Sequence, residues 1–102
     1  MNVAVKLIMS WDILPGREQE YFEFVVREWV PGIQRLGLEP TDAWFTMYGN
    51  HPQIIAGAQI DDRQDLNILL DSTEWLALTE RLLNFVTDFS FKVVQARKGF
   101  QM

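Results

Sequence analysis

The chain contains few side chains that could carry out chemistry, because its 102 residues include one histidine and no cysteine. The histidine, His51, stands in the stretch Gly-Asn-His-Pro at residues 49–52. As the base of a Ser–His–acid triad it would need a serine partner, and none of the three serines stands in a Gly-x-Ser-x-Gly nucleophile turn. Asn and Gly tolerate positive φ, and a residue before proline is extended, so the stretch is also typical of a hairpin loop. We therefore consider His51 either a catalytic group at the rim of a pocket or a turn residue.

Lysines within alternating apolar segments are a second source of acid–base chemistry, and Lys6 and Lys92 occupy such positions. Burial in apolar surroundings lowers the pKa of a lysine, which can then act as a general base. Cofactor-independent oxygenases and isomerases need an apolar, aromatic pocket with one or two polar groups. The strand-like segments supply four candidate ligand-binding residues: Trp11, Trp44, Tyr48 and Gln59. The alternative is that the aromatic side chains form ordinary core and dimer contacts and that the lysines extend to solvent.

A metal site would have to be built from carboxylates. Asp61, Asp62 and Asp65 form the densest acidic cluster, yet they stand at the start of a predicted helix. Carboxylates at that position accept hydrogen bonds from free backbone N–H groups, so we predict helix capping and no metal. The sequence also lacks a P-loop and a dinucleotide-binding fingerprint, so we expect no cofactor.

Charge and composition narrow the classes of partner. The net charge is −5, and no basic cluster could neutralise the phosphates of a nucleic acid. Residues 3–14 are apolar but too short to cross a bilayer, and they lack the features of a signal peptide. The absence of cysteine suits a reducing compartment. We therefore expect a cytoplasmic protein that binds neither nucleic acid nor membrane.

The hydrophobic pattern predicts the elements that position these residues. Apolar side chains alternate with period two in residues 3–13, which is typical of a strand. Pro31 should kink the first helix, and Gly37 suits a left-handed cap at its end. The apolar residues of that helix recur at helical spacing: Phe22, Val25, Val26, Trp29, Ile33 and Leu36. The complete set of predicted elements is strands at 3–13, 41–49, 53–61 and 89–97, and helices at 17–37, 61–72 and 72–86.

The order β-α-β-β-α-β predicts an α+β fold of the ferredoxin-like type, a four-stranded antiparallel sheet with the helices on one face. We expect residues 1–102 to form a single domain. A sheet that is open to water on one side should alternate cleanly, but these strands carry apolar residues on both faces. The pairs concerned are Val5 and Ile8, Trp44 and Phe45, Ile54 and Ile55, and Val93 and Val94. We therefore predict a homodimer through the open sheet face; the alternative is a monomer whose lysines shield that face.

The chain resembles the dimeric α/β-barrel superfamily, which includes antibiotic-biosynthesis-monooxygenase-like and NIPSNAP-like domains. The resemblance covers nearly the whole chain and is one of topology and turn chemistry. It rests on four segments: LPGREQEYFEF, VPGIQRLGL, WFTMYGNHPQIIAG and LLDSTEWLALTERLLNFV. The superfamily contains cofactor-independent oxygenases, isomerases, haem enzymes and ligand-binding domains, so the fold does not select an activity.

Two functions follow from these observations. One is a small-molecule-binding dimeric α/β-barrel protein that acts as a cofactor-independent oxygenase or isomerase on an apolar or aromatic compound. The other is a non-catalytic dimeric domain that binds a ligand or a protein. A wide cavity with a buried polar group would favour the first, and a fully packed interior would favour the second. The sequence is compatible with either an enzyme or a non-catalytic domain.

Overall fold

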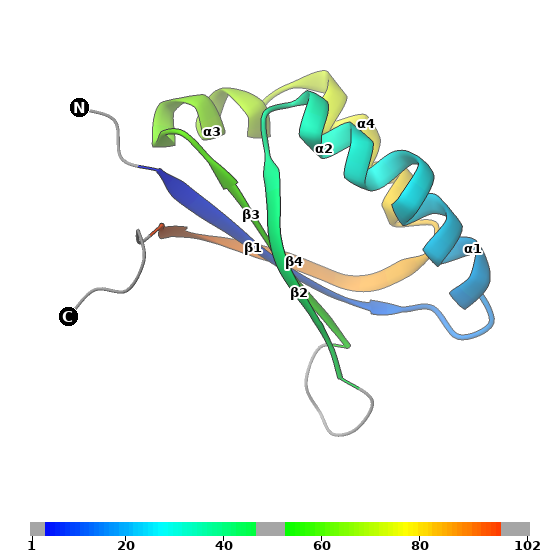
Figure 1. Ribbon diagram of the computed structural model, residues 1–102. Helices are drawn as coiled ribbons and strands as arrows, with labels where there is room; N and C mark the ends of the chain where they lie inside the picture. The colour runs from blue at the N-terminus through cyan, green and yellow to red at the C-terminus, as the bar shows by residue number, and fades with distance from the viewer. Residues whose placement is uncertain (1–3, 47–52, 97–102) are drawn as a thin grey trace.

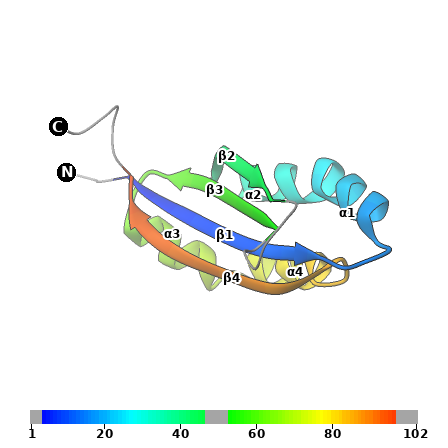
Figure 2. The same ribbon diagram turned by 90° about the horizontal axis from the view of Figure 1, so that it is seen from below.

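The computed structural model describes residues 4–46 and 53–96. Their strands form one four-stranded antiparallel sheet in the order β2-β3-β1-β4. The helices lie together on one face of this sheet (Figure 1), and Figure 2 shows the opposite face without a helix over it. The predicted ferredoxin-like α+β fold is confirmed. The elements are β1 (Val5–Ile13), α1 (Glu18–Phe24), the π-helical segment η1 (Val25–Trp29), α2 (Val30–Arg35), β2 (Glu39–Phe45), β3 (Ile54–Ile60), α3 (Arg63–Leu70), α4 (Thr73–Leu82) and β4 (Val86–Gln95).

Strand β1 lies at the centre of the fold, between β3 and β4. Its side chains alternate between buried and half-buried along the whole strand, as the period of two predicts. Leu7, Met9 and Trp11 point toward the helices and are almost completely buried. The same strand therefore presents every second residue to the helical core and the residues between them to the other face.

The first helix is interrupted by η1, which ends two residues before Pro31. Proline has no N–H and cannot donate to the carbonyl of Arg27, so the regular hydrogen-bond ladder cannot continue there. The π-helical turn changes which side chains face the sheet, because Phe24 and Trp29 are both buried although they are five residues apart. The predicted apolar face was wrong in its first half: Phe22 and Val26 are exposed, while Tyr21 and Phe24 are buried.

The end of the first helix confirms the predicted glycine cap. Gly37 has a φ of 101°, in the left-handed region. The N–H of Leu38 donates to the carbonyl of Ile33 at 2.9 Å, and the N–H of Gly37 donates to that of Gln34 at 3.0 Å. This is a Schellman motif, and Leu38 is completely buried as its hydrophobic residue.

The later helices begin at side-chain caps. Asp62 Oδ1 accepts a hydrogen bond from the N–H of Asp65 at 2.8 Å at the start of α3. Ser72 Oγ accepts one from the N–H of Trp75 at 3.1 Å at the start of α4. The capping role predicted for the acidic cluster is thus seen in Asp62.

Strand β4 begins earlier than predicted, because α4 ends at Leu82 and Val86 already belongs to the sheet. Val86 is buried opposite Ile13, a position that suits a β-branched side chain. Asp88 has a φ of 58°, and the pairing of β1 with β4 shifts register beside it, so the strand contains a bulge.

Candidate functional site

Four of the predicted site residues lie on the face of the sheet that no described element covers. Lys6 is directly opposite Gln59 in the pairing of β1 with β3, and Trp44 is opposite Ile55 in that of β2 with β3. Lys92 is opposite Ile8 in the pairing of β1 with β4. Side chains of directly opposed residues point to the same face of a sheet. The register therefore brings Lys6, Lys92, Trp44 and Gln59 to one surface, which we call the uncovered face.

Apolar side chains cross the uncovered face in a diagonal line. Trp44 on β2 and Ile55 on β3 are opposite each other, and Ile55 is also opposite Ser10 on β1. Ile8 is two residues from Ser10, and Val94 on β4 is opposite Lys6, two residues beyond Ile8. Trp44 is 54% exposed and Val94 37%, while Ile8 and Ile55 are half-buried. We call these four residues the apolar diagonal: Trp44, Ile55, Ile8 and Val94.

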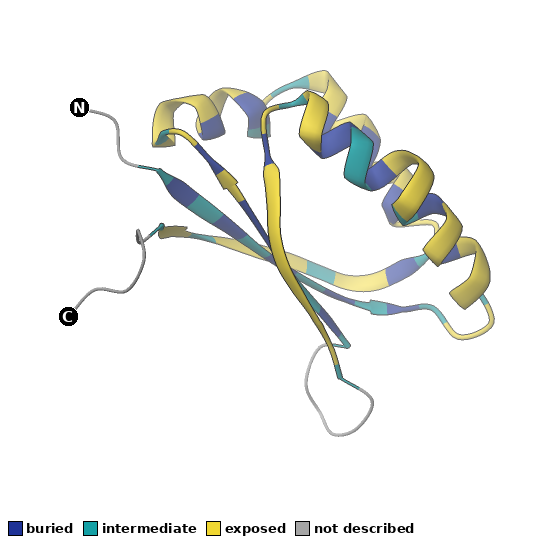
Figure 3. Cartoon of the chain, viewed as in Figure 1, coloured by how far each residue is buried: buried dark blue, intermediate teal, exposed yellow. Residues whose placement is uncertain are grey.

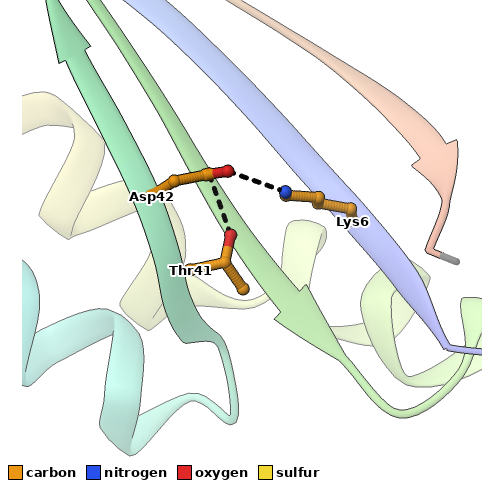
Figure 4. Close-up of polar contacts among 3 residues, drawn as sticks. All are labelled: Lys6, Thr41 and Asp42. Carbon is orange, nitrogen blue, oxygen red and sulfur yellow. Dashed lines mark hydrogen bonds and ion pairs between the residues drawn. The ribbon is translucent and has the colours of Figure 1, made fainter. Parts of the chain in front are cut away.

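An ion pair spans β3 on the same face (Figure 4). Lys6 Nζ, from β1, donates to Asp42 Oδ2, from β2, at 3.1 Å. Thr41 Oγ1 donates to the other carboxylate oxygen of Asp42 at 3.0 Å. Thr41 and Asp42 lie where the pairing of β2 with β3 shifts register, which is why adjacent residues can both reach this point.

Gly57 on β3 makes room for the ion pair. It is opposite Asp42 in the strand pairing, directly beneath the path from Lys6. A Cβ atom at this position would lie 2.5 Å from Asp42 Oδ1 and 2.7 Å from Lys6 Cε. Any other residue would displace one of the two charged side chains. Glycine in a strand interior marks this kind of close approach.

Further hydrogen bonds lie on the uncovered face along β1 and at its end. Ser10 Oγ and Ser90 Oγ are 2.9 Å apart, with either hydroxyl able to donate. The N–H of Gln53 donates to Asp12 Oδ1 at 2.8 Å, and the N–H of Ile13 donates to Gln53 Oε1 at 2.8 Å. These two bonds join the last residues of β1 to Gln53, the residue that precedes β3.

Trp11, another predicted ligand-binding residue, lies on the opposite, helix-facing side of the sheet. It is 2% exposed and stacks on Phe89 with ring centroids 5.9 Å apart. Its Nε1 donates to Tyr21 Oη at 2.9 Å. Trp11 is thus part of the helical core, on the other side of the sheet from the uncovered face. Its place follows from the strand alternation, since it shares the parity of Leu7 and Met9.

Tyr21 is a polar group of the core that the helical pattern did not single out. Burial raises the pKa of its hydroxyl, and the hydrogen bond from Trp11 acts in the opposite direction. At neutral pH the side chain is therefore a neutral phenol. No charged side chain is buried among the described residues.

The remaining candidates, Tyr48 and His51, lie outside the described residues. Within residues 4–46 and 53–96, no three His, Cys, Asp or Glu side chains are grouped so that they could hold a metal ion. In the same ranges no helix is long and apolar enough to cross a membrane.

A hollow of about 410 Å³ lies on the helical layer between α2 and α4; its lining residues are Gly32, Arg35, Leu36, Glu74, Ala77, Leu78 and Arg81.

Solved structures share this fold, although no protein-family profile and no curated protein sequence matches the chain. A NIPSNAP family protein from Agrobacterium tumefaciens is 19% identical, with a TM-score of 0.66 over 95% of this chain and 89% of that one. An antibiotic-biosynthesis-monooxygenase-like protein from Nitrosomonas europaea is 9% identical, with a TM-score of 0.66 over 94% and 92%. A dimeric protein of unknown function and ferredoxin-like fold from Bacteroides fragilis is 14% identical, with a TM-score of 0.61 over 91% and 96%.

At these identities the matches establish the fold. The chain has the ferredoxin-like architecture of these NIPSNAP and monooxygenase-like proteins, so the fold that the resemblance implied is confirmed. Matched structures include proteins of unknown function, so the fold leaves the activity to be argued from the site.

Proposed function

We propose that this chain is a homodimeric small-molecule-binding domain in which the uncovered faces of two sheets pack against each other as a dimeric α/β barrel. The observation that carries the proposal is the apolar diagonal on a sheet face that no described helix covers. Apolar surface of this kind is stabilised when it is removed from water, and a second copy of the same surface is the simplest cover.

The edge strands support the same arrangement. Every residue of β2 is exposed, whichever face of the sheet its side chain is on (Figure 3). Most residues of β4 are exposed as well. Edge strands with free hydrogen-bonding groups and apolar side chains are normally covered or paired in stable proteins. The Bacteroides fragilis protein of the same fold is described as dimeric. The proposal takes residues 1–102 as a single domain, because one buried cluster joins β1, β3, β4 and the helices.

The uncovered face is also the surface that we assign to the ligand. Trp44 offers a half-exposed aromatic ring, and Gln59 offers an exposed amide that can donate and accept. An apolar compound with one polar group fits this combination. Lys6 Nζ donates to Asp42 Oδ2, so its charge is already paired within the chain, and Trp44 and Gln59 remain for the ligand.

Native mass spectrometry of the freshly purified protein tests both parts of the proposal. The chain has a mass of 11.9 kDa, so we expect a species at twice that mass, together with a retained small molecule. Trp44→Ala should weaken the dimer and reduce the retained ligand. Phe22→Ala is the matched control, because Phe22 is 50% exposed on α1 compared with 54% for Trp44, and it should change neither. A monomer at micromolar concentration would refute the dimer.

A further inference from the structure

Among the described residues, Lys92 has no acidic neighbour on the uncovered face. It is exposed and forms no ion pair within the described residues. The side chains around it on this face are the opposed Ile8, the flanking Ser90 and Val94 on β4, and Lys6 and Ser10 on β1. Removing an ammonium group from water without a partner is costly, so a carboxylate of the second copy would stabilise a dimer that covers Lys92.

The opposite edge of the sheet, β2, carries a carboxylate that forms no ion pair within the described residues. Glu39 on β2 shares the uncovered face, since it is opposite Gln59. Its described polar contact is a long hydrogen bond, 3.5 Å, from Gln34 Nε2 of α2, so the carboxylate lies at the edge of the sheet where β2 meets α2. Asp42, the other acidic residue of β2, is already paired with Lys6. Within the described residues, Glu39 at the edge of β2 is therefore a carboxylate without an ion-pair partner, and Lys92 on β4 is an ammonium group without one.

These two charges cannot meet within one chain. The sheet order places β2 and β4 at opposite edges, three strand spacings apart, which is about 14 Å at about 4.8 Å per spacing. In a symmetric pair of copies, an edge of one sheet can approach the opposite edge of the other, and each contact is made twice.

We propose that Lys92 of each copy pairs with Glu39 of the other, and that these two ion pairs determine how the copies are oriented in the homodimer. This inference rests on the proposed function, because it requires dimerisation through the uncovered face. It adds the residues that decide which edge meets which. Complementary charges at an interface favour the correct register and disfavour alternatives that place like charges together.

Charge reversal tests the pairing directly. Lys92→Glu and Glu39→Lys should each raise the dimer dissociation constant at least about tenfold in analytical ultracentrifugation at low salt, because each places like charges together. An equimolar mixture of the two variants should form a heterodimer close to wild-type affinity, since both contacts are then complementary. Recovery on mixing also shows that the variants are folded.

Two variants with the same changes in charge serve as controls. Arg63→Glu on α3 and Glu80→Lys on α4 alter exposed residues of the helical layer and should leave the dissociation constant unchanged. A Lys92→Glu variant that dimerises like the wild type, or a mixture without heterodimer, would overturn the pairing. If the wild type is dimeric and Trp44→Ala alone disrupts it, the pairing fails while the proposed function stands; a monomeric wild type refutes both.

Discussion

Gly57 should control whether Lys6 and Asp42 interact. A Cβ atom on residue 57 would lie 2.5 Å from Asp42 Oδ1 and 2.7 Å from Lys6 Cε, closer than unbonded atoms can approach. Both contacts are with movable side chains, so Gly57→Ala should separate the ion pair without rearranging β3. Alanine also loses less conformational entropy than glycine in a strand, by about 0.5–1 kcal/mol.

Loss of the ion pair lowers the free energy of unfolding, whereas the smaller entropy cost of alanine raises it. The total change in stability therefore does not report on the ion pair, and the coupling between the two charges must be measured. The side chains of Lys6 and Asp42 are 24% and 35% exposed, and pairs near a surface contribute about 0.2–1 kcal/mol. A double-mutant cycle with Lys6→Met and Asp42→Asn, followed by urea unfolding at one protein concentration, should give about 0.5–1 kcal/mol of coupling in the wild type. In the Gly57→Ala background the coupling should fall to about zero.

A second cycle provides the control. Arg81 and Glu28 form an ion pair at 3.1 Å between helices, far in the fold from β3. Their coupling should be the same with Gly57 and with alanine at that position. If the coupling of Lys6 with Asp42 survives Gly57→Ala, the claim that glycine makes room for the ion pair is wrong.

Two further predictions concern the helical side of the sheet. Burial raises the pKa of Tyr21 above its ordinary value of 10.0, so the neutral phenol is favoured in the folded state; stability should be complete below pH 10 and decrease as the pH rises through the folded-state pKa. In Tyr21→Phe, unfolding curves should show a smaller decrease in stability above pH 10. A pH profile identical to that of the wild type would contradict the role given to Tyr21. Gly32→Ala should destabilise the fold by about 1–3 kcal/mol, because its Cβ would lie 2.8 Å from Leu78 Cδ2. Calorimetry would measure this loss, and shortening the neighbour in Gly32→Ala/Leu78→Ala should relieve the clash.

Local patterns in the sequence predict most of the fold. The alternation in β1, the glycine cap at Gly37 and the acidic start of α3 each depend on neighbouring residues, and each is confirmed. The apolar side chains expected on a second sheet face are those of the apolar diagonal.

The contacts at the site could not be predicted in the same way. The meeting of Lys6 with Asp42 over Gly57 depends on the register of three strands and on a shift in the pairing of β2. No pattern within one segment contains that information, so Asp42 and Gly57 were not candidates. Tyr21 was missed because the π-helical segment changes the phase of the helix, and a regular period of 3.6 places Phe22 in the core instead.

The π-helical segment also has a consequence for how this chain should be aligned with others. Between the buried Phe24 and Trp29 the helix contains one residue more than an α-helical turn requires, and Val26, at 71% exposed, contributes nothing to the core within that turn. A protein that lacks one residue here could place equivalent side chains in its core through an uninterrupted α-helix. A single-residue gap at this point would therefore mark two ways of building the same layer, and sequence comparisons that penalise gaps inside helices would underestimate the relationship.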